Sequence, residues 1–138
     1  MDPDCLFCKI ATRQIPTKVV YEDDATMAFL EIMPRAPGHT MVIAKQHAPT
    51  LLELSDADRT ALFTSVKKVD ALLIERLNPD GMTIGINQGG ASGQEIQHLH
   101  VHLMPRWYDD KGGSIQSIVS LTDKNKQKEA EKRLLGII

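Results

Sequence analysis

The segment His98-Leu99-His100-Val101-His102-Leu103-Met104 decides the expected fold and chemistry of this chain. Histidine and apolar side chains alternate along it, which is the period-two pattern of a β-strand with one buried face. We expect Leu99, Val101 and Leu103 to enter a core and the three histidines to line the opposite face. An exposed polar strand that happens to carry histidine is the plainer alternative. We disfavour it because histidine is rare and three at this spacing are rarer.

A glycine-rich stretch leads directly into these histidines. Residues 87–95 are Asn-Gln-Gly-Gly-Ala-Ser-Gly-Gln-Glu. Glycines let the backbone turn several N–H groups towards one point, which forms a nest for an anion. The histidine row alone leaves two chemistries open, metal binding and covalent or acid–base catalysis. The adjacent loop favours the second, with backbone donors holding phosphate oxygens while an imidazole attacks phosphorus.

The flanking sequence predicts strands around one long helix. Ser55 is a candidate N-cap, and the helix is expected to run from there to Leu77. The apolar residues at helical spacing within it are Leu62, Val66, Val69, Leu73 and Leu77. A short helix or turn is expected over 5–12, and a polar helix over 122–135. Strands are expected over 18–21, 26–32, 40–44, 82–86 and 98–104. This order predicts an α+β fold with an antiparallel sheet.

Composition narrows the class of protein. The chain has 138 residues, of which 42% are apolar and 25% charged, as in an ordinary globular domain. A net charge of −2 and only 4% aromatic residues disfavour a nucleic-acid-binding module, which needs basic charge and stacking side chains. We find no apolar run long enough to span a membrane and no signal-peptide pattern in Met1-Asp2-Pro3-Asp4. A cytoplasmic location is therefore expected.

Cys5 and Cys8 have the spacing of a zinc half-site. A thioredoxin-like redox pair is one alternative, but it needs a strand before the motif, and only four residues precede Cys5. Two free thiols are the other alternative.

Residues 93–104, Gly-Gln-Glu-Ile-Gln-His-Leu-His-Val-His-Leu-Met, resemble the signature of the histidine-triad (HIT) family. Further matching segments, in the family's usual order, are Cys5-Leu-Phe-Cys-Lys-Ile, Ile15-Pro16, 21–23, 28–32 and 38–47. The resemblance covers about residues 5–106 and is closest to the zinc-binding bacterial type of the Hint-like branch. It implies a single HIT domain over 1–138, with a five-stranded antiparallel sheet, one long helix and one or two short ones. A helical tail over about 107–138 carries little of the family signal.

The resemblance implies a nucleotide hydrolase that acts at the α-phosphorus of a purine nucleotide. His100 would be the nucleophile, and water would then cleave the nucleotidyl-histidine and release AMP or GMP without a catalytic divalent cation. His102 would contact the phosphate and help protonate the leaving group. Glu31 would bind the ribose hydroxyls. The residues implied near the phosphate are Asn87, Gly93, Gln94 and Glu95, and those implied around the base, or simply in the core, are Leu6, Phe7, Ile10 and Phe29. His39 is implied as a support beside the nucleophile, or as an ordinary hydrogen-bonded histidine at a strand end.

Glu95 departs from the family pattern, in which a serine that contacts the phosphate or the leaving group often stands at this position. A carboxylate that faces a phosphate repels it unless it is protonated or turned away. Either only the backbone N–H of Glu95 is used, or the choice of leaving group differs.

The resemblance also implies the rest of a metal site. His47 and His98 would join Cys5 and Cys8 as ligands, and such a closed Cys₂His₂ set is typical of a structural zinc ion. The site would tie the N-terminal turn to the active strand and help orient His100. The resemblance further implies a homodimer formed through the long helix and an adjacent strand.

Three functions remain in competition at this stage. The first is hydrolysis of a nucleoside 5′-phosphoramidate, and the second is hydrolysis of a dinucleoside polyphosphate. The third is a nucleotide-binding interaction protein with weak activity, which the presence of all three triad histidines disfavours.

Overall fold

The computed structural model describes residues 1–120 and 122–136. In this part of the chain five strands form one sheet: β1 (Val19–Glu22), β2 (Thr26–Leu30), β3 (Thr40–Ala44), β4 (Gly81–Gly85) and β5 (His100–Arg106). Neighbouring strands are antiparallel, and their order is β1-β2-β3-β5-β4. The α-helices are α1 (Leu6–Ala11), α2 (Asp56–Leu77) and α3 (Lys124–Leu134), and short 3₁₀ turns are η1 (Gly90–Ser92) and η2 (Ile115–Ser117). The predicted α+β fold with a five-stranded antiparallel sheet is confirmed.

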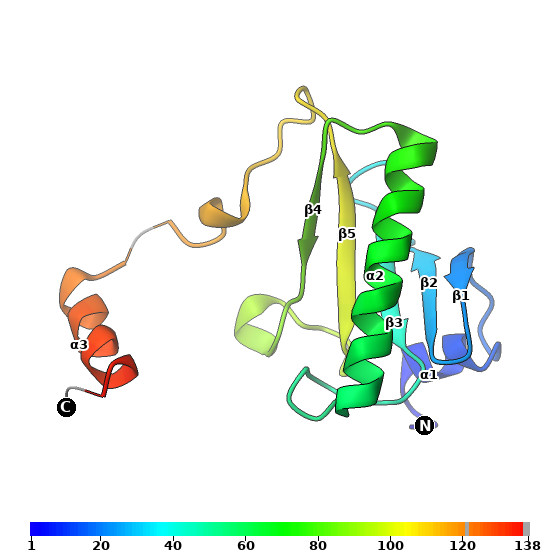
Figure 1. Cartoon of the computed structure of the whole chain (residues 1–138), viewed down its shortest axis with the longest axis horizontal. Coiled ribbons are helices and arrows are strands. Elements are labelled where there is room, and N and C mark those ends of the chain that lie inside the picture. Colours follow the sequence, from blue (N-terminus) through cyan, green and yellow to red (C-terminus); the bar gives the residue numbers. More distant parts are fainter. Residues whose placement is uncertain (121, 137–138) are drawn as a thin grey trace.

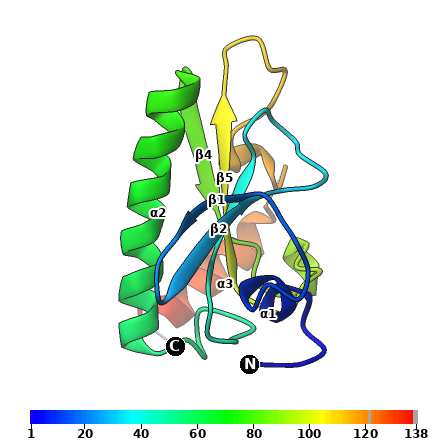
Figure 2. The same ribbon diagram turned by 90° about the vertical axis from the view of Figure 1, so that its right-hand side faces the viewer.

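The long helix α2 covers one face of the sheet, and α1 lies against the other (Figures 1 and 2). Ser55 caps α2 by accepting a hydrogen bond from the backbone N–H of Asp58, and Asn78 ends it in the left-handed conformation. The residues of the α2 core are Ala28, Val42, Ala44, Ala48, Leu54, Leu62, Val66, Val69, Leu73, Leu99, Val101 and Leu103. Leu77, expected in this stripe, is 39% exposed, because α2 ends there over Gly38 and beyond the main core.

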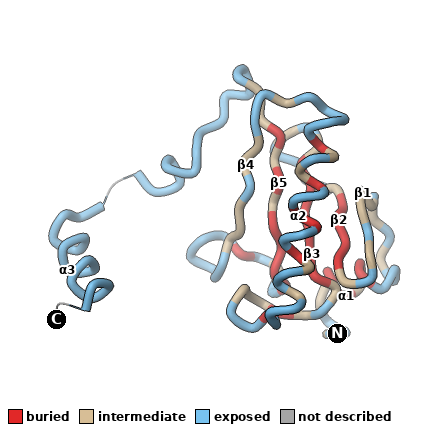
Figure 3. The backbone as a smooth tube through the Cα atoms, viewed as in Figure 1, coloured by how far each residue is buried: buried red, intermediate tan, exposed pale blue. Residues whose placement is uncertain are grey.

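A second, smaller core lies under α1. It consists of Phe7, Ile10, Ala11, Met27, Phe29, Met41 and Ile43. Strands β2 and β3 contribute to both cores because successive side chains of a strand point to opposite faces. Nine of their ten residues are accordingly buried, and both strands are largely red in Figure 3.

The register between β3 and β5 fixes the face on which the histidines lie. Met41 opposes His102, and Ile43 opposes His100. Directly opposed residues share a face, so both histidines lie on the α1 side. Val101 and Leu103 point instead into the α2 core. The predicted alternation along this strand is confirmed.

Four of the five strands differ by one or two residues from their expected bounds, and two of these differences have a visible cause or consequence. β5 begins at His100 and not at His98. The residues before His100 do not pair with β3 as a strand. The N–H of Leu99 instead donates to the carbonyl of Ala48, and the ring of His98 bonds to the carbonyl of Ala44. β2 ends at Leu30, and Ile32, expected inside it, is 88% exposed.

Beyond β5 the chain forms an arm that stands apart from the sheet (Figure 1). We use the term arm for residues 108–120 and 122–136, all of which are exposed (Figure 3). Asp123 caps α3 by accepting from the backbone N–H groups of Asn125 and Lys126, close to the predicted start of this helix. The arm carries apolar side chains that are 56–86% exposed, at Ile115, Ile118, Val119, Leu134 and Leu135.

None of the described helices combines the length and the hydropathy needed to cross a membrane.

The α2 core predicts a clear difference between two leucines. Leu62 is 0% exposed and Leu52 is 83% exposed. We expect Leu62→Ala to lower the free energy of unfolding by about 2–5 kcal/mol, because it removes packed methyl groups and leaves a cavity. Leu52→Ala should change it by less than about 0.5 kcal/mol. Urea denaturation measures both, and equal losses would contradict this account of the core.

Candidate functional site

His100 lies at the start of β5 beneath α1, with its ring centroid 5.1 Å from that of Phe7. Its Nδ1 lies 2.8 Å from the backbone oxygen of His98. A carbonyl oxygen only accepts hydrogen bonds, so Nδ1 carries the proton, and the neutral ring keeps a lone pair on Nε2. The residue is 7% exposed, yet it lines a cavity, so a small molecule can reach it.

The cavity has a volume of about 320 Å³, within the range of small-molecule sites. Its apolar wall includes Leu6, Phe7, Ile10, Ile15, Phe29 and Met41. Its polar lining consists of Glu31, Asn87, Gly93, Glu95, His100 and His102, together with Thr17. An apolar wall beside a few convergent polar groups is the usual form of a site for an organic ligand. The structure thus brings together nearly all residues that the sequence placed around a substrate.

Gln94 has a different position from the one expected. Its side-chain oxygen accepts from the N–H of Gly89 at 2.8 Å, and its amide nitrogen donates to the carbonyl of Pro49 at 2.7 Å. The residue is 6% exposed and is absent from the described lining of the cavity. In this conformation the side chain of Gln94 braces the glycine-rich loop, and its expected phosphate contact stays a prediction.

The glycine-rich loop also differs from the open anion nest that we expected. The backbone N–H groups of Ser92 and Gln94 donate to the carbonyl of Gly89, and that of Gly93 donates to Gly90. These bonds close the 3₁₀ turn η1, so the same donors already have partners within the loop. Gly93 has a φ of +99°, which other residues rarely adopt, and this turn brings its backbone beside Asn87 at the cavity.

His39 contacts His102, not the nucleophile candidate beside which we expected it. Its Nε2 lies 2.9 Å from Nδ1 of His102, and the backbone N–H of Arg35 donates to its Nδ1 at 3.2 Å. Burial lowers the pKa of His39, and burial together with the nearby rings of His100 and His39 lowers the pKa of His102 to about 4. Both rings are therefore neutral at neutral pH.

Four further ligand atoms meet at the N-terminal turn. One atom each from Cys5, Cys8, His47 and His98 lies within 4.8 Å of all the others. The sulfur–nitrogen distances are 3.5 Å for Cys5–His98, 3.6 Å for Cys8–His98 and 3.4 Å for Cys8–His47. A tetrahedral zinc ion with ordinary bond lengths separates sulfur and nitrogen ligands by about 3.5 Å. The residues therefore fit a metal ion of this geometry.

Neighbouring backbone groups and burial set the proton positions of the ligand atoms in this cluster. Nε2 of His98 lies 2.7 Å from the carbonyl oxygen of Ala44, which fixes the proton there and leaves Nδ1 to bind a metal. Burial lowers the pKa of His98 to about 4, so the ring is neutral, as a ligand must be. The sulfur of Cys8 accepts from the backbone N–H of Asp2 at 3.4 Å. Burial raises the pKa of the Cys8 thiol, and a bound cation would reverse that effect.

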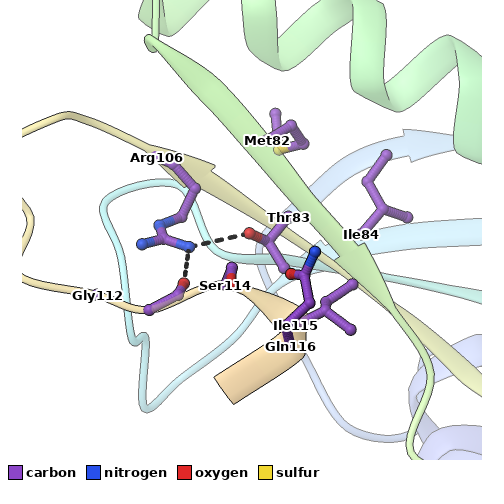
Figure 4. Close-up of a pocket in the computed structure, with 9 residues that line it drawn as sticks. Met82, Thr83, Ile84, Arg106, Gly112, Ser114, Ile115 and Gln116 are labelled. Carbon is purple, nitrogen blue, oxygen red and sulfur yellow. Dashed lines mark hydrogen bonds between the residues drawn. The ribbon is translucent and has the colours of Figure 1, made fainter. Parts of the chain in front are cut away.

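A second cavity, of about 640 Å³, lies between β4 and the arm (Figure 4). Arg106 lines this cavity, and its guanidinium group donates to Thr83, Asp110 and the carbonyl of Gly113. These partners hold the guanidinium group within the protein, so its charge is not free to bind a ligand. Arg106 instead joins the edge strand to the root of the arm.

Sequence reasoning missed several groups that shape both sites. The carbonyl of Ala44 and the N–H of Arg35 belong to the backbone and leave no trace in residue types. Ile15 and Met41 in the cavity wall resemble any other apolar core residue.

Sequence comparison assigns the chain to a family. The model of the HIT domain matches residues 12–108. An uncharacterised HIT-like protein of Methanocaldococcus jannaschii is 41% identical over 118 residues, which are 83% of this chain and 91% of that protein. An adenylylsulfatase of Arabidopsis thaliana, HINT3, is 35% identical over 103 residues, which are 75% of this chain and 52% of that protein.

Solved structures agree with this assignment. A histidine triad nucleotide-binding protein from Candida albicans has a TM-score of 0.79 at 28% identity, with 96% of each chain covered. A zinc-bound histidine triad family protein from Mycobacterium smegmatis has a TM-score of 0.74 at 29% identity, with 93% of this chain and 88% of that one covered. With its triad on the α1 face and its Cys₂His₂ cluster beside it, the chain belongs to the Hint-like branch of the HIT family of nucleotide-binding and nucleotide-hydrolysing proteins.

Proposed function

We propose that this protein hydrolyses purine nucleotides at the α-phosphorus through a nucleotidyl intermediate on His100, and that nucleoside 5′-phosphoramidates are its substrate class. One observation carries the proposal. Nδ1 of His100 is bonded to a carbonyl oxygen, so the lone pair of Nε2 belongs to a ring that lines the cavity. A neutral imidazole held in this tautomer is a nucleophile.

The lining of the cavity suits a nucleoside monophosphate. The aromatic rings of Phe7 and Phe29 and the side chain of Ile10 offer an apolar wall for a base. The carboxylate of Glu31 can accept hydrogen bonds from two ribose hydroxyls. Asn87 and His102 provide side-chain donors for phosphate oxygens beside His100.

The reaction proceeds in two displacements. Nε2 of His100 attacks phosphorus, and the bond from phosphorus to the leaving nitrogen breaks. The nitrogen keeps the electron pair, takes up a proton from His102 or from water, and departs as an amine. The resulting imidazolium keeps its Nδ1 proton against the carbonyl of His98, which stabilises the positive charge. Water then attacks phosphorus and gives up a proton to His102 or to solvent. The bond from phosphorus to Nε2 breaks with its electron pair returning to His100, and the nucleoside monophosphate departs. In this scheme no divalent cation contacts the phosphate.

A second candidate substrate class comes from Glu95 and from a relative. Glu95 is exposed and lines the cavity next to the phosphate-binding residues, where its charge bears on the choice of leaving group. The related Arabidopsis protein is an adenylylsulfatase, so a mixed anhydride of AMP is the alternative to a phosphoramidate. Dinucleoside polyphosphates form a third class for direct comparison.

The covalent step predicts an adduct at one residue. Brief incubation with an AMP phosphoramidate should add the mass of an adenylyl group to the peptide that contains His100. We expect His100→Ala to abolish the adduct and to lower kcat by about 10⁴-fold, the usual scale for loss of a nucleophile. Peptide mass spectrometry and steady-state kinetics measure the two effects. Lys68→Ala, on the exposed side of α2, serves as the control and should behave like the unmodified protein. Undiminished turnover by His100→Ala would refute the mechanism.

We also propose that Cys5, Cys8, His47 and His98 hold a structural zinc ion. Four protein ligands leave no open coordination position for a substrate, which is the mark of a structural site. The zinc-bound mycobacterial structure supports the choice of metal. Because the cysteines must stay reduced to bind zinc, the proposal places the protein in a reducing compartment such as the cytoplasm.

Zinc binding predicts a link between metal content and stability. Purified protein should contain one zinc ion per chain, and Cys8→Ala should lose it. The Tm of the intact protein should fall when a chelator removes the metal, because a bound metal stabilises only the folded state. Elemental analysis and thermal denaturation measure these effects, with Ser92→Ala as the control. Absence of zinc from the reduced, intact protein would end this part of the proposal.

We further propose that two copies of the chain form a homodimer. β4 is an edge strand of the sheet, and the arm beside it exposes apolar side chains that find no cover within the described chain. Exposed apolar surface of this kind marks sites of association.

The dimer predicts a change of mass in solution. The full chain should have the mass of two copies by light scattering. Ile118→Asp combined with Val119→Asp should shift it towards one copy, because both side chains are about three-quarters exposed on the arm, at 75% and 74%. Gln14→Asp, an exposed position near α1, is the matched control and should remain dimeric. A full chain that is monomeric at micromolar concentration would contradict the proposal.

A further inference from the structure

The segment before α1 folds back onto the Cys₂His₂ cluster, and Asp2 makes its contacts there. The backbone N–H of Asp2 donates to Sγ of Cys8 at 3.4 Å. The backbone carbonyl of Asp2 accepts from the N–H of Cys5 at 3.2 Å. A backbone N–H that points at a sulfur stabilises the thiolate, which is the form that binds metal ions. Main-chain groups of Asp2 are thus bonded to both cysteines of the cluster.

The carboxylate of Asp2 has two neighbours. Its Oδ1 accepts from the backbone N–H of Asp4 at 2.8 Å, which closes a short turn of the kind that aspartate commonly forms. With Oδ1 held in this way, Oδ2 faces His47, whose Nε2 lies 3.8 Å away. That distance is an ion-pair contact and is longer than a hydrogen bond. The side chains of Asp2 and His47 are 43% and 21% exposed, so water reaches the edge of the pair.

The two ring nitrogens of His47 face different groups. Nδ1 lies 3.4 Å from Sγ of Cys8, inside the cluster, and Nε2 lies on the side of Asp2. A neutral imidazole that binds a metal through Nδ1 carries its proton on Nε2. A carboxylate on the Nε2 side attracts that N–H, which orients the ring and makes Nδ1 a better ligand. The carboxylate of Asp2 has the position that such a partner requires.

His98 has the same arrangement with a different oxygen. Its Nδ1 faces the cysteine sulfurs, and its Nε2 lies 2.7 Å from the carbonyl oxygen of Ala44. Both histidines therefore turn Nδ1 towards the cluster and Nε2 towards an oxygen atom. A backbone carbonyl and a carboxylate are the usual partners of a metal-binding histidine. Within residues 1–120 and 122–136, Asp2 is the only hydrogen-bond or ion-pair partner of Nε2 in His47.

We infer that Asp2 is a positioning residue of the metal site: its carboxylate orients His47, and its backbone N–H holds the sulfur of Cys8. The inference rests on the proposed function, because it concerns the ligands of the proposed zinc ion. It makes the segment before α1 a part of the metal site, although none of its side chains is a ligand. Zinc should be retained more tightly with Asp2 in place, because oriented ligands lose less freedom when the ion binds.

Two aspartate variants test the role of the carboxylate. Asp2→Asn keeps an oxygen that can accept from the N–H of Asp4, but it removes the negative charge that faces His47. Asp4→Asn removes the same charge from an exposed side chain that makes no hydrogen bond or ion pair with the cluster. Competition with a chromophoric chelator measures the zinc dissociation constant of the full-length, reduced protein.

The two variants should differ in zinc affinity. We expect Asp2→Asn to raise the dissociation constant about 10-fold, at the lower end of the usual range because water screens the pair. Asp4→Asn should change it by less than about twofold. Asp2→Glu, which restores the charge on a longer side chain, should recover part of the loss. Equal affinities of Asp2→Asn and Asp4→Asn would overturn the inference and leave the zinc proposal intact.

NMR separates an oriented ligand from a general loss of stability. Long-range ¹H–¹⁵N spectra of zinc-loaded protein with ¹⁵N-labelled histidine report the ring nitrogens, with signals assigned through the backbone. Asp2→Asn should shift Nε2 of His47 and leave Nε2 of His98 unchanged, because Ala44 still holds the latter. An unmoved His47 signal, or a His47 without a proton on Nε2 in the unmodified protein, would overturn the inference. Absence of zinc from the unmodified protein would overturn the inference and the zinc proposal together.

Discussion

Three polar groups of His98, a residue with no exposed surface, are used at once. Its Nε2 bonds to the carbonyl of Ala44, its Nδ1 faces the two cysteine sulfurs, and its own carbonyl accepts from Nδ1 of His100. The first bond ties the approach of β5 to the end of β3. The second joins the N-terminal turn to the same point, and the third sets the tautomer of the ring in the cavity. A displacement of this one residue would disturb the sheet, the metal ligands and the nucleophile candidate together.

The two faces of the sheet have different roles: one packs against α2 in the main core, and the other carries the histidines of the cavity. α2 packs on one face against an apolar core, with Val101 and Leu103 of β5 buried in it. The opposite face carries His100 and His102 from the same strand. Because the side chains alternate, the α2 core can hold β5 rigidly without occupying the cavity. α1 covers only part of the second face, which leaves room for a ligand between its apolar residues and the histidines.

All five histidines of the chain belong to one connected region, but they divide into two tasks. His47 and His98 face the cysteines, while His39, His100 and His102 stand in or beside the cavity. Backbone groups, not side chains, decide the protons of His98, His39 and His100. The result is that rings of the same residue type serve two neighbouring sites, the metal cluster and the cavity.

Much of this could be predicted from local patterns, since they act through neighbours in the sequence. The alternation along β5, the cap at Ser55 and the spacing of Cys5 and Cys8 each report a local geometry, and the triad motif identified the family. The tertiary structure alone decided the place of Gln94 under the loop, the partner of His39, the start of β5 and the arm that leaves the sheet. The physical reason is that these features depend on backbone carbonyls and amides brought together from distant segments. Such groups are the same in nearly every residue, so only the fold determines which side chain meets them.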